Sequence, residues 1–277
     1  MKQSFLRRPA IAAAAGLLIS FGAWAQQYPP PPPPQAMPAQ VQPSQVDSLV
    51  QRIALYPDPL LAQILTASTY SDQIPEAATW ANQHSYMNQQ DLSAAITQDQ
   101  LPWDPSILAL LPFPQMLNMM SQDMGWTQAL GQAVLSDRAA VMDAVQRQRQ
   151  TAQQYGYLQS NNYEQVTGGP GDIEILPVNP DMIYVPAYDP RVVSAAPRPG
   201  FFVGGAIHFG PGITIGAGFR PYGWAGAGIG WREHNVIIDH RPWVRTWSNR
   251  GVYVHPYEHP MPHFAGPRTE RHELRRH

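Results

Sequence analysis

The sequence predicts a mainly α-helical domain with a small β-hairpin (an α+β fold), followed by a Gly-, Arg- and His-rich C-terminal region that is partly disordered. Between about residues 46 and 157, apolar residues recur at helical spacing in short pieces that proline and polar residues separate. From Asp172 onward the spacing changes to strict alternation, which is typical of a strand. The 277 residues also include 30 Pro and 21 Gly, concentrated outside this region, so the flanks cannot pack like an ordinary core.

Residues 1–25 have the pattern of a secretory signal peptide. Lys2, Arg7 and Arg8 form a positive start, residues 10–21 are apolar, and residues 23–25 (Ala-Trp-Ala) match a small-x-small cleavage site. A membrane anchor would need about 20 apolar residues, but a polar, Pro-rich stretch follows at once. We therefore expect cleavage after Ala25 and a location in the periplasm or cell envelope.

Residues 26–45 are expected to form an extended linker. They include six consecutive prolines at residues 29–34, which favour the polyproline II conformation and leave nothing to build a core. The linker would act as a tether for the domain that follows.

The helical domain is expected to span residues 46–195. Leu60, Leu61, Ile64 and Leu65 fall on one helical stripe, and a second piece at residues 74–80 would complete a helical hairpin. The last helix is expected over residues 126–155. These short amphipathic pieces predict a domain of several packed helices.

Two Asp-Pro pairs are typical of helix starts. In Asp58-Pro59 and in Asp104-Pro105, aspartate at the N-cap would accept backbone N–H bonds, and proline at the next position needs no N–H donor. Both aspartates are therefore interpreted as helix N-caps with a structural role.

A β-hairpin is expected to end the domain. Residues 172–178 would form one strand, residues 179–181 (Asn-Pro-Asp) a turn, and residues 182–185 the second strand. Tyr188, Tyr184 and Asp189 are candidates to line a groove there, and buried tyrosines with one hydrogen bond each are the alternative. Outside the hairpin, short strands are expected at residues 236–238 and 252–254.

Four motifs in this region resemble a known family. They are Ile-Ala-Leu-Tyr-Pro-Asp-Pro-Leu-Leu at residues 53–61, Leu-Pro-Trp-Asp-Pro-Ser at 101–106, Leu-Leu-Pro-Phe-Pro at 110–114 and Tyr-Val-Pro-Ala-Tyr-Asp-Pro at 184–190. Together they resemble the bacterial family called domain of unknown function 3300 (DUF 3300) over about residues 49–193. The resemblance implies an exported envelope protein of Gram-negative bacteria, associated with the membrane through a hydrophobic stretch. It implies no enzymatic activity, cofactor or site residues.

Residues 196–231 form a Gly-rich apolar segment. From residue 203 to 219 bulky residues hold odd positions and small residues even ones, interrupted by Gly-Pro-Gly at residues 210–212. This period predicts a hairpin of residues 203–209 and 213–219, whose arms are shorter than the roughly nine to eleven residues of a transmembrane strand. We expect the segment to dock on the domain or to stay poorly ordered. The alternatives are that the segment contacts a membrane or a second copy of the chain, or that it spans the membrane.

Charge is divided between the two halves of the chain. Residues 26–190 carry a balance of −11 and residues 191–277 a balance of +6, and every positive side chain after Lys2 is arginine. Arginine pairs with phosphate and stacks on aromatic rings. Because export argues against nucleic acid, the expected partners are anionic lipid, lipopolysaccharide, an envelope protein or another copy. The candidate anionic-surface residues are Arg220, Arg232, Arg241, Arg245 and Arg250, interleaved with Trp224, Trp231, Trp243 and Trp247.

The Arg- and His-rich tail, residues 232–277, also contains a candidate metal site. His255, His259 and His263 are spaced four apart with Glu258 among them, which on a helix would align three imidazoles for a divalent metal. Prolines at residues 256, 260 and 262 prevent a regular helix. We therefore expect weak zinc, copper or nickel binding at most, with no dedicated cofactor. A solvated tail is the alternative.

No motif identifies an enzyme. The sequence lacks the Gly-x-Ser-x-Gly, His-Glu-x-x-His and Ser-x-x-Lys patterns, and it has no cysteine for a nucleophile, a disulfide or a thiolate site. The favoured function is a non-catalytic envelope binding or scaffold protein whose C-terminal region contacts a membrane or anionic surface or self-associates. Low-affinity metal binding is one alternative. An unrecognised envelope hydrolase, whose catalytic groups meet only in space, is the other.

Overall fold

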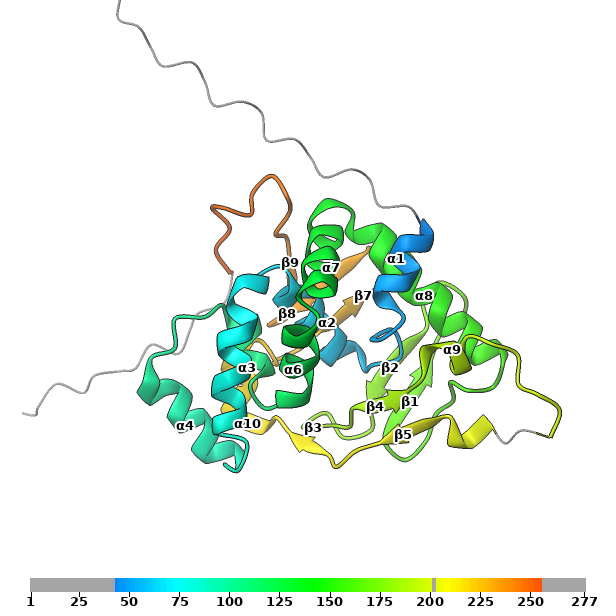
Figure 1. Ribbon diagram of the computed structural model, residues 1–277, viewed down its shortest axis with the longest axis horizontal. Helices are drawn as coiled ribbons and strands as arrows, with labels where there is room; N and C mark the ends of the chain where they lie inside the picture. The colour runs from blue at the N-terminus through cyan, green and yellow to red at the C-terminus, as the bar shows by residue number, and fades with distance from the viewer. Residues whose placement is uncertain (1–42, 201–202, 256–277) are drawn as a thin grey trace, which may run out of the picture. The chain divides into compact units, whose positions relative to one another are not determined.

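The computed structural model describes residues 43–200 and 203–255 (Figure 1). Within them, helices dominate and the strands form small antiparallel sheets, so the α+β prediction is confirmed. The predicted signal peptide and nearly all of the predicted linker lie outside these residues. No helix in the described ranges is both long enough and apolar enough to cross a membrane.

The helices are α1 (Pro43–Val50), α2 (Asp58–Ser68), α3 (Ile74–Gln83), α4 (Gln89–Asp99), α5 (Pro105–Leu110), α6 (Pro114–Gln122), α7 (Met124–Ser136), α8 (Arg138–Gln154), α9 (Pro190–Val193) and α10 (Gly216–Phe219). The strands are β1 (Glu164–Thr167), β2 (Glu174–Pro177), β3 (Met182–Ile183), β4 (Pro186–Tyr188), β5 (Ile207–Phe209), β6 (Ile213–Thr214), β7 (Gly228–Gly230), β8 (Asn235–Ile238) and β9 (Arg241–Trp243).

Helix α2 is the centre of the fold. All of its residues except Pro59 are buried, and it contacts α5 and α7 on one side and β2, β7 and β8 on another. At Gly131 of α7 the two backbones come very close, because a Cβ there would lie 2.1 Å from the carbonyl oxygen of Ser68. A helix buried on every face must be covered by elements from the rest of the chain.

The predicted helices need two corrections. The second stripe forms α3, but this helix packs chiefly on α6, so the expected α2–α3 hairpin is not the main contact. The single helix expected over residues 126–155 is two helices, because Asp137 interrupts it. The Asp137 backbone is non-helical, and its carboxylate accepts a hydrogen bond from the Ala140 N–H, which starts α8.

The predicted strands mostly exist, but their predicted pairing is wrong. Strand β2 pairs with β1, while residues 182–188 (β3 and β4) pair with residues 207–214 (β5 and β6), so the two expected hairpins do not form. At Gly212 the paired segments come very close, because a Cβ there would lie 2.6 Å from the Met182 sulfur. The bulky residues Ile215 and Phe219 of this segment are buried in the core, and Gly212, Gly216 and Gly218 also lie close to residues of the domain. Residues 216–219 form α10, and the strand expected at residues 252–254 is absent.

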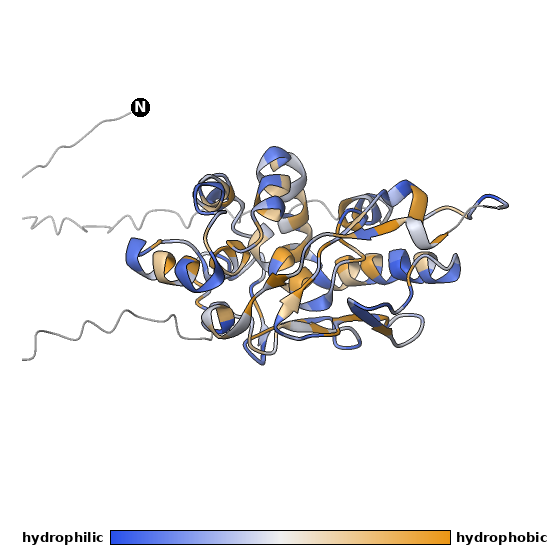
Figure 2. Cartoon of the chain, turned by 90° about the horizontal axis from the view of Figure 1, so that it is seen from below, coloured by the Kyte–Doolittle hydropathy of each residue, from blue (hydrophilic) through white to orange (hydrophobic). Residues whose placement is uncertain are grey.

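The C-terminal region belongs to the same core as the helices. The buried side chains shared with α2, α5 and α7 include Phe219, Tyr222, Trp224, Val236 and Trp243. Figure 2 shows hydrophobic residues gathered where the helices meet these later strands. The composition predicted that the domain ends near residue 195. The core instead continues past that residue, because tryptophans and β-branched residues between the later glycines supply core side chains.

Candidate functional site

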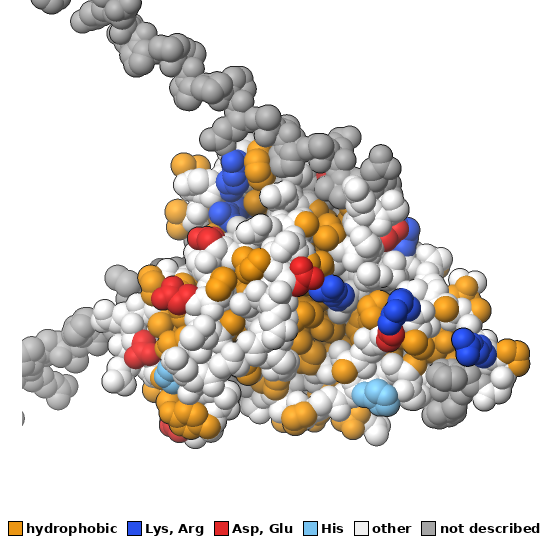
Figure 3. Space-filling model, in the orientation of Figure 1, with side chains coloured by type: hydrophobic (Ala, Val, Ile, Leu, Met, Phe, Trp, Pro, Cys, Tyr) orange, Lys and Arg blue, Asp and Glu red, His pale blue; other side chains and the backbone are white. Residues whose placement is uncertain are grey.

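A groove of about 740 Å³ lies between the helical part and the small strands. Its walls come from the α3–α4 turn, the α5–α6 turn, β4 and the β5–β6 turn. In Figure 3 hydrophobic side chains gather in the middle of the face, between α3 and α6 and the strands β4 and β5. It is larger than two other cavities among the described residues, which have about 440 and 270 Å³.

Three of the four sequence motifs meet at this groove. Tyr56 comes from the first motif, residues 111, 112 and 114 from the third, and residues 185–187 from the fourth. Four prolines (112, 114, 186 and 211) stand in the walls, and proline fixes its backbone φ. The groove is therefore shaped before any ligand arrives.

The lining is uncharged. The residues that line the groove include no Asp, Glu, Lys or Arg, and Met87 and Met116 lie among the apolar ones. The ring of His84 stacks on Trp80 at 3.9 Å between centroids, and its Nδ1 lies 2.8 Å from the Trp80 carbonyl oxygen. A surface of this kind suits a largely apolar ligand, and it has no Lys or Arg among its lining residues to pair with a phosphate.

Beneath the first and fourth motifs lies a buried ion pair. Arg149 is fully buried and its guanidinium lies 2.6 Å from the carboxylate of Asp58. Its other N–H groups donate to the carbonyls of Ala54, Tyr56 and Ile173, and the Trp231 indole N–H donates to Asp58. Burial raises the pKa of Asp58, and the guanidinium and the indole act against that rise.

Asp58 therefore differs from its predicted role. Asp58 is the first residue of α2, and its carboxylate accepts no hydrogen bond from a backbone N–H of that helix. The carboxylate instead accepts hydrogen bonds from Arg149, from the Trp231 indole and from the Ile175 N–H. Asp104, in contrast, is the N-cap of α5 and accepts the Ser106 N–H.

Glu164 lies beside this pair as a second buried carboxyl. The residue is 3% exposed, and its Oε1 has no hydrogen-bond partner among the described residues. Burial raises the pKa of Glu164 from its ordinary value of 4.5 to about 8, with nearby Arg149 acting against the rise. Sequence reasoning missed this residue, since a glutamate in a polar run shows no sign of burial.

Glu164 should make stability depend on pH. Between about pH 4.5 and 8 the unfolded chain releases this proton and the folded chain keeps it, so rising pH favours unfolding. Relative to Glu164→Gln, the wild type should become steadily less stable across this window, by at most about 5 kcal/mol at about 1.4 kcal/mol per pH unit. Urea unfolding of both proteins at several pH values checks this, and a pH-independent difference would contradict it.

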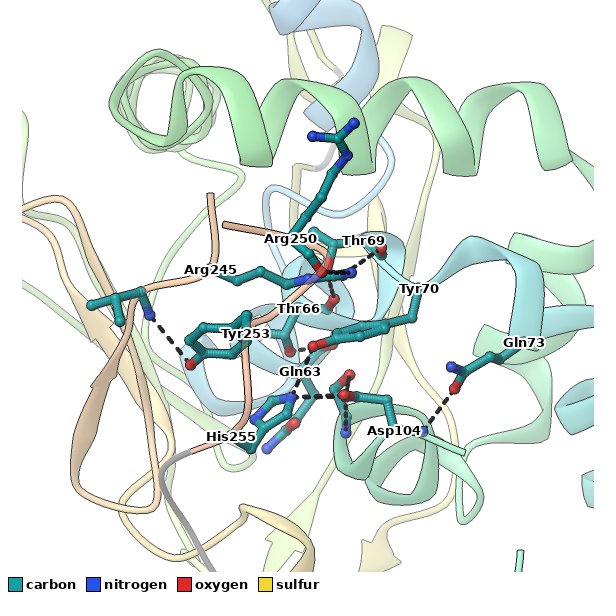
Figure 4. A network of polar contacts seen from close by, with 12 residues as sticks. Gln63, Thr66, Thr69, Tyr70, Gln73, Asp104, Arg245, Arg250, Tyr253 and His255 are labelled. Carbon is teal, nitrogen blue, oxygen red and sulfur yellow. Dashed lines mark hydrogen bonds and ion pairs between the residues drawn. The ribbon is translucent and has the colours of Figure 1, made fainter. Parts of the chain in front are cut away.

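A polar network fastens residues 244–255 to the helices (Figure 4). His255 Nε2 lies 2.8 Å from Asp104 and 3.3 Å from the Tyr70 hydroxyl. Arg245 donates to the carbonyl and hydroxyl of Thr69 and stacks on the Tyr70 ring at 3.7 Å. Burial alone would raise the pKa of Asp104, but the hydrogen bonds from His255 and Ser106 prevail and lower it.

The candidate anionic-surface residues do not form one exposed face. Three of the four tryptophans are buried core residues, namely Trp224, Trp231 and Trp243, and Trp247 is half-buried. The side chains of this region that reach solvent are therefore those of residues that lie between the tryptophans in the sequence. Arg220 is exposed and pairs with Asp181, and Arg232 is exposed and pairs with Asp172. Of the other three arginines, Arg245 is buried, Arg250 is partly buried and Arg241 is exposed. The interleaved pattern thus combines core tryptophans with arginines of which Arg220, Arg232 and Arg241 are exposed and Arg245 is buried.

The candidate metal ligands are not brought together within the described residues. His255 faces Asp104, whereas Glu258, His259 and His263 lie outside those residues. In residues 43–200 and 203–255 no three His, Asp or Glu side chains are placed to share a metal ion.

The tyrosines of the predicted groove have structural contacts. The Tyr188 hydroxyl donates to the Gln51 carbonyl and accepts the Leu55 N–H, which holds the turn before α2. Tyr184 packs on Tyr163 at 4.6 Å between ring centroids, and Asp189 caps α9. The groove that does form lies on the other side of this strand segment, at residues 185–187.

Comparison with known proteins gives one family and one relative. A family model described as "Protein of unknown function (DUF3300)" matches residues 42–259, which confirms the resemblance and extends it past residue 193. The uncharacterized protein YacH of Escherichia coli (strain K12) is 36% identical over 182 residues, covering 54% of this chain. This chain spans only 29% of the length of that relative. No solved structure matches.

Proposed function

Because the chain belongs to the family described as protein of unknown function (DUF3300), whose description assigns no activity, we propose a function from the groove itself. The protein is a non-catalytic binding protein of the bacterial cell envelope, and its groove holds an extended apolar segment of a partner polypeptide. The observation that carries this proposal is the uncharged, Pro- and Met-rich lining of the 740 Å³ groove. The envelope location rests on the signal-peptide pattern of residues 1–25.

Size and rigidity both favour a binding role. Ligand sites usually have about 300–1,000 Å³, and this groove lies within that range. Prolines in the wall reduce the conformational entropy lost on binding, because that wall is already ordered. The side chains of Met87 and Met116 can adapt to apolar residues of different shape.

A peptide fits better than a lipid acyl chain, because the wall also carries amide groups. Gln89 and Gln115 line the groove, and Gln115 is exposed. Such amides can bond to a peptide backbone, whereas an acyl chain would leave them unpaired.

A charge in the groove should abolish peptide binding. Ala187 is exposed and lines the groove, so Ala187→Glu places a carboxylate there without disturbing the core. We expect a labelled nine-residue peptide of Leu, Val and Pro to bind the wild type and to bind Ala187→Glu at least about tenfold more weakly, because the carboxylate must be desolvated. Fluorescence polarisation measures both affinities.

Ala195→Glu is the matched control, since Ala195 is also exposed but lies outside the groove. Equal peptide affinity for the wild type and Ala187→Glu would overturn the proposal, as would binding of spin-labelled palmitate at this groove in preference to the peptide. The second result would identify a lipid-binding protein.

A further inference from the structure

A second cavity, of about 440 Å³, lies on the far side of the buried ion pair. It is lined by the turn after α8, by β1 and by residues 203–209, and shares no lining residue with the groove. Tyr157, Tyr163 and Phe209 contribute aromatic rings to its wall, and Glu164 contributes a carboxyl group. The lining residues include no Lys, Arg or His.

Glu164 is held in place, but its Oε1 has no hydrogen-bond partner among the described residues. Its backbone N–H donates to the Asn161 side chain, and residue 164 starts β1 opposite Pro177. The nearest cation, Arg149, donates to Asp58 and to three backbone carbonyls. If all three buried groups are ionised, Asp58, Glu164 and Arg149 sum to one negative charge, which the structure does not balance.

We propose that this cavity binds a small organic cation that carries a primary ammonium group, held by the Glu164 carboxylate against the rings of Tyr157, Tyr163 and Phe209. An ammonium in the cavity would supply positive charge beside ionised Glu164 and Asp58, and its N–H groups donate hydrogen bonds to carboxylates. Aromatic faces attract cations, so the remaining wall favours the same ligand. This site is independent of the peptide groove.

Binding is coupled to release of a proton. Because burial raises the pKa of Glu164 to about 8, the carboxyl is mostly protonated at pH 7 in the free protein. The ionisable groups around it are Arg149, Asp58 and Tyr188, and among these only Arg149 favours the carboxylate. An ammonium ligand requires the carboxylate, so affinity rises with pH up to about 8 and then levels off.

The test uses 1,4-diaminobutane, with 1,4-butanediol as its uncharged counterpart, in isothermal titration calorimetry of the full chain. We expect the diamine to bind the wild type at pH 8.5, and to bind Glu164→Gln at least tenfold more weakly. Glu174→Gln, on the partner strand and outside the cavity, should bind like the wild type. At pH 7, titrations in buffers of different ionisation enthalpy should show release of close to one proton.

Three results would overturn the cation site. The first is that the wild type does not bind the diamine at pH 8.5. The second is that the wild type and Glu164→Gln bind the diamine with equal affinity, and the third is that the wild type binds the diol as tightly as the diamine. Circular dichroism confirms that each variant is folded. Ala187→Glu should bind the diamine normally, so a failure of the peptide groove and a failure of the cation site are distinguished.

Discussion

Replacing Arg149 by methionine should lower the free energy of unfolding by about 3–5 kcal/mol at pH 7. The substitution leaves the Asp58 carboxylate buried without its cation and deprives three buried carbonyls of a donor. Removing one partner of a buried ion pair has an effect of this size, because the desolvated charge that stays behind is uncompensated. Urea unfolding followed by circular dichroism measures the loss.

Arg147 provides a matched control on the same helix. It pairs with Asp47 at 2.6 Å, but the two side chains are 46% and 32% exposed, so Arg147→Met should change stability by less than about 1 kcal/mol. Combining Arg149→Met with Asp58→Asn should recover part of the loss, since no charge then remains buried. Similar losses for the two single Arg variants would show that the buried pair has no special role.

Replacing Trp243 by alanine should also destabilise the whole domain, by about 3–5 kcal/mol. Trp243 is fully buried, and the Arg138 guanidinium stacks on its ring at 4.7 Å. Removal of so large a side chain leaves a cavity between β9 and the helices, and core truncations of this kind have effects of that order. Thermal and urea unfolding, both followed at helical wavelengths, should show the shift.

The control for this variant is Val252→Ala, in the segment that follows β9. Val252 is 83% exposed, so its truncation should leave stability within about 0.5 kcal/mol. If Trp243→Ala left the helical transition unchanged, the C-terminal strands would not belong to the core of the helical domain.

Local features of the fold were predictable, whereas strand partners were not. The stripe at residues 60–65, the cap at Asp104 and the strand at residues 236–238 depend on neighbours in sequence, and the structure has all three. The pairing of residues 182–188 with 207–214 brings distant segments together, with Gly212 lying against Met182. A period of two identifies strands but does not select their partners.

The candidate sites were harder to foresee for a similar reason. Alternating tryptophan and arginine fits both a membrane surface and a buried strand with a charged outer side, and only packing decides between them. The motifs identified Tyr56, Pro112 and Pro186, but nothing local shows that they face one groove. Glu164 has no local signal, because its burial depends on Leu55 and on residues 203–209 closing around it.

The burial of α2 on every face has a consequence for how the chain matures. A polypeptide emerges N-terminus first, from the ribosome and from an export channel alike, so α2 has emerged long before β7 and β8, which cover it. The domain therefore cannot become native stepwise as the chain emerges. It must keep this apolar helix shielded in a loosely collapsed state, or bound to a chaperone, until about residue 243 is available, and then fold in one late step dominated by contacts between distant segments.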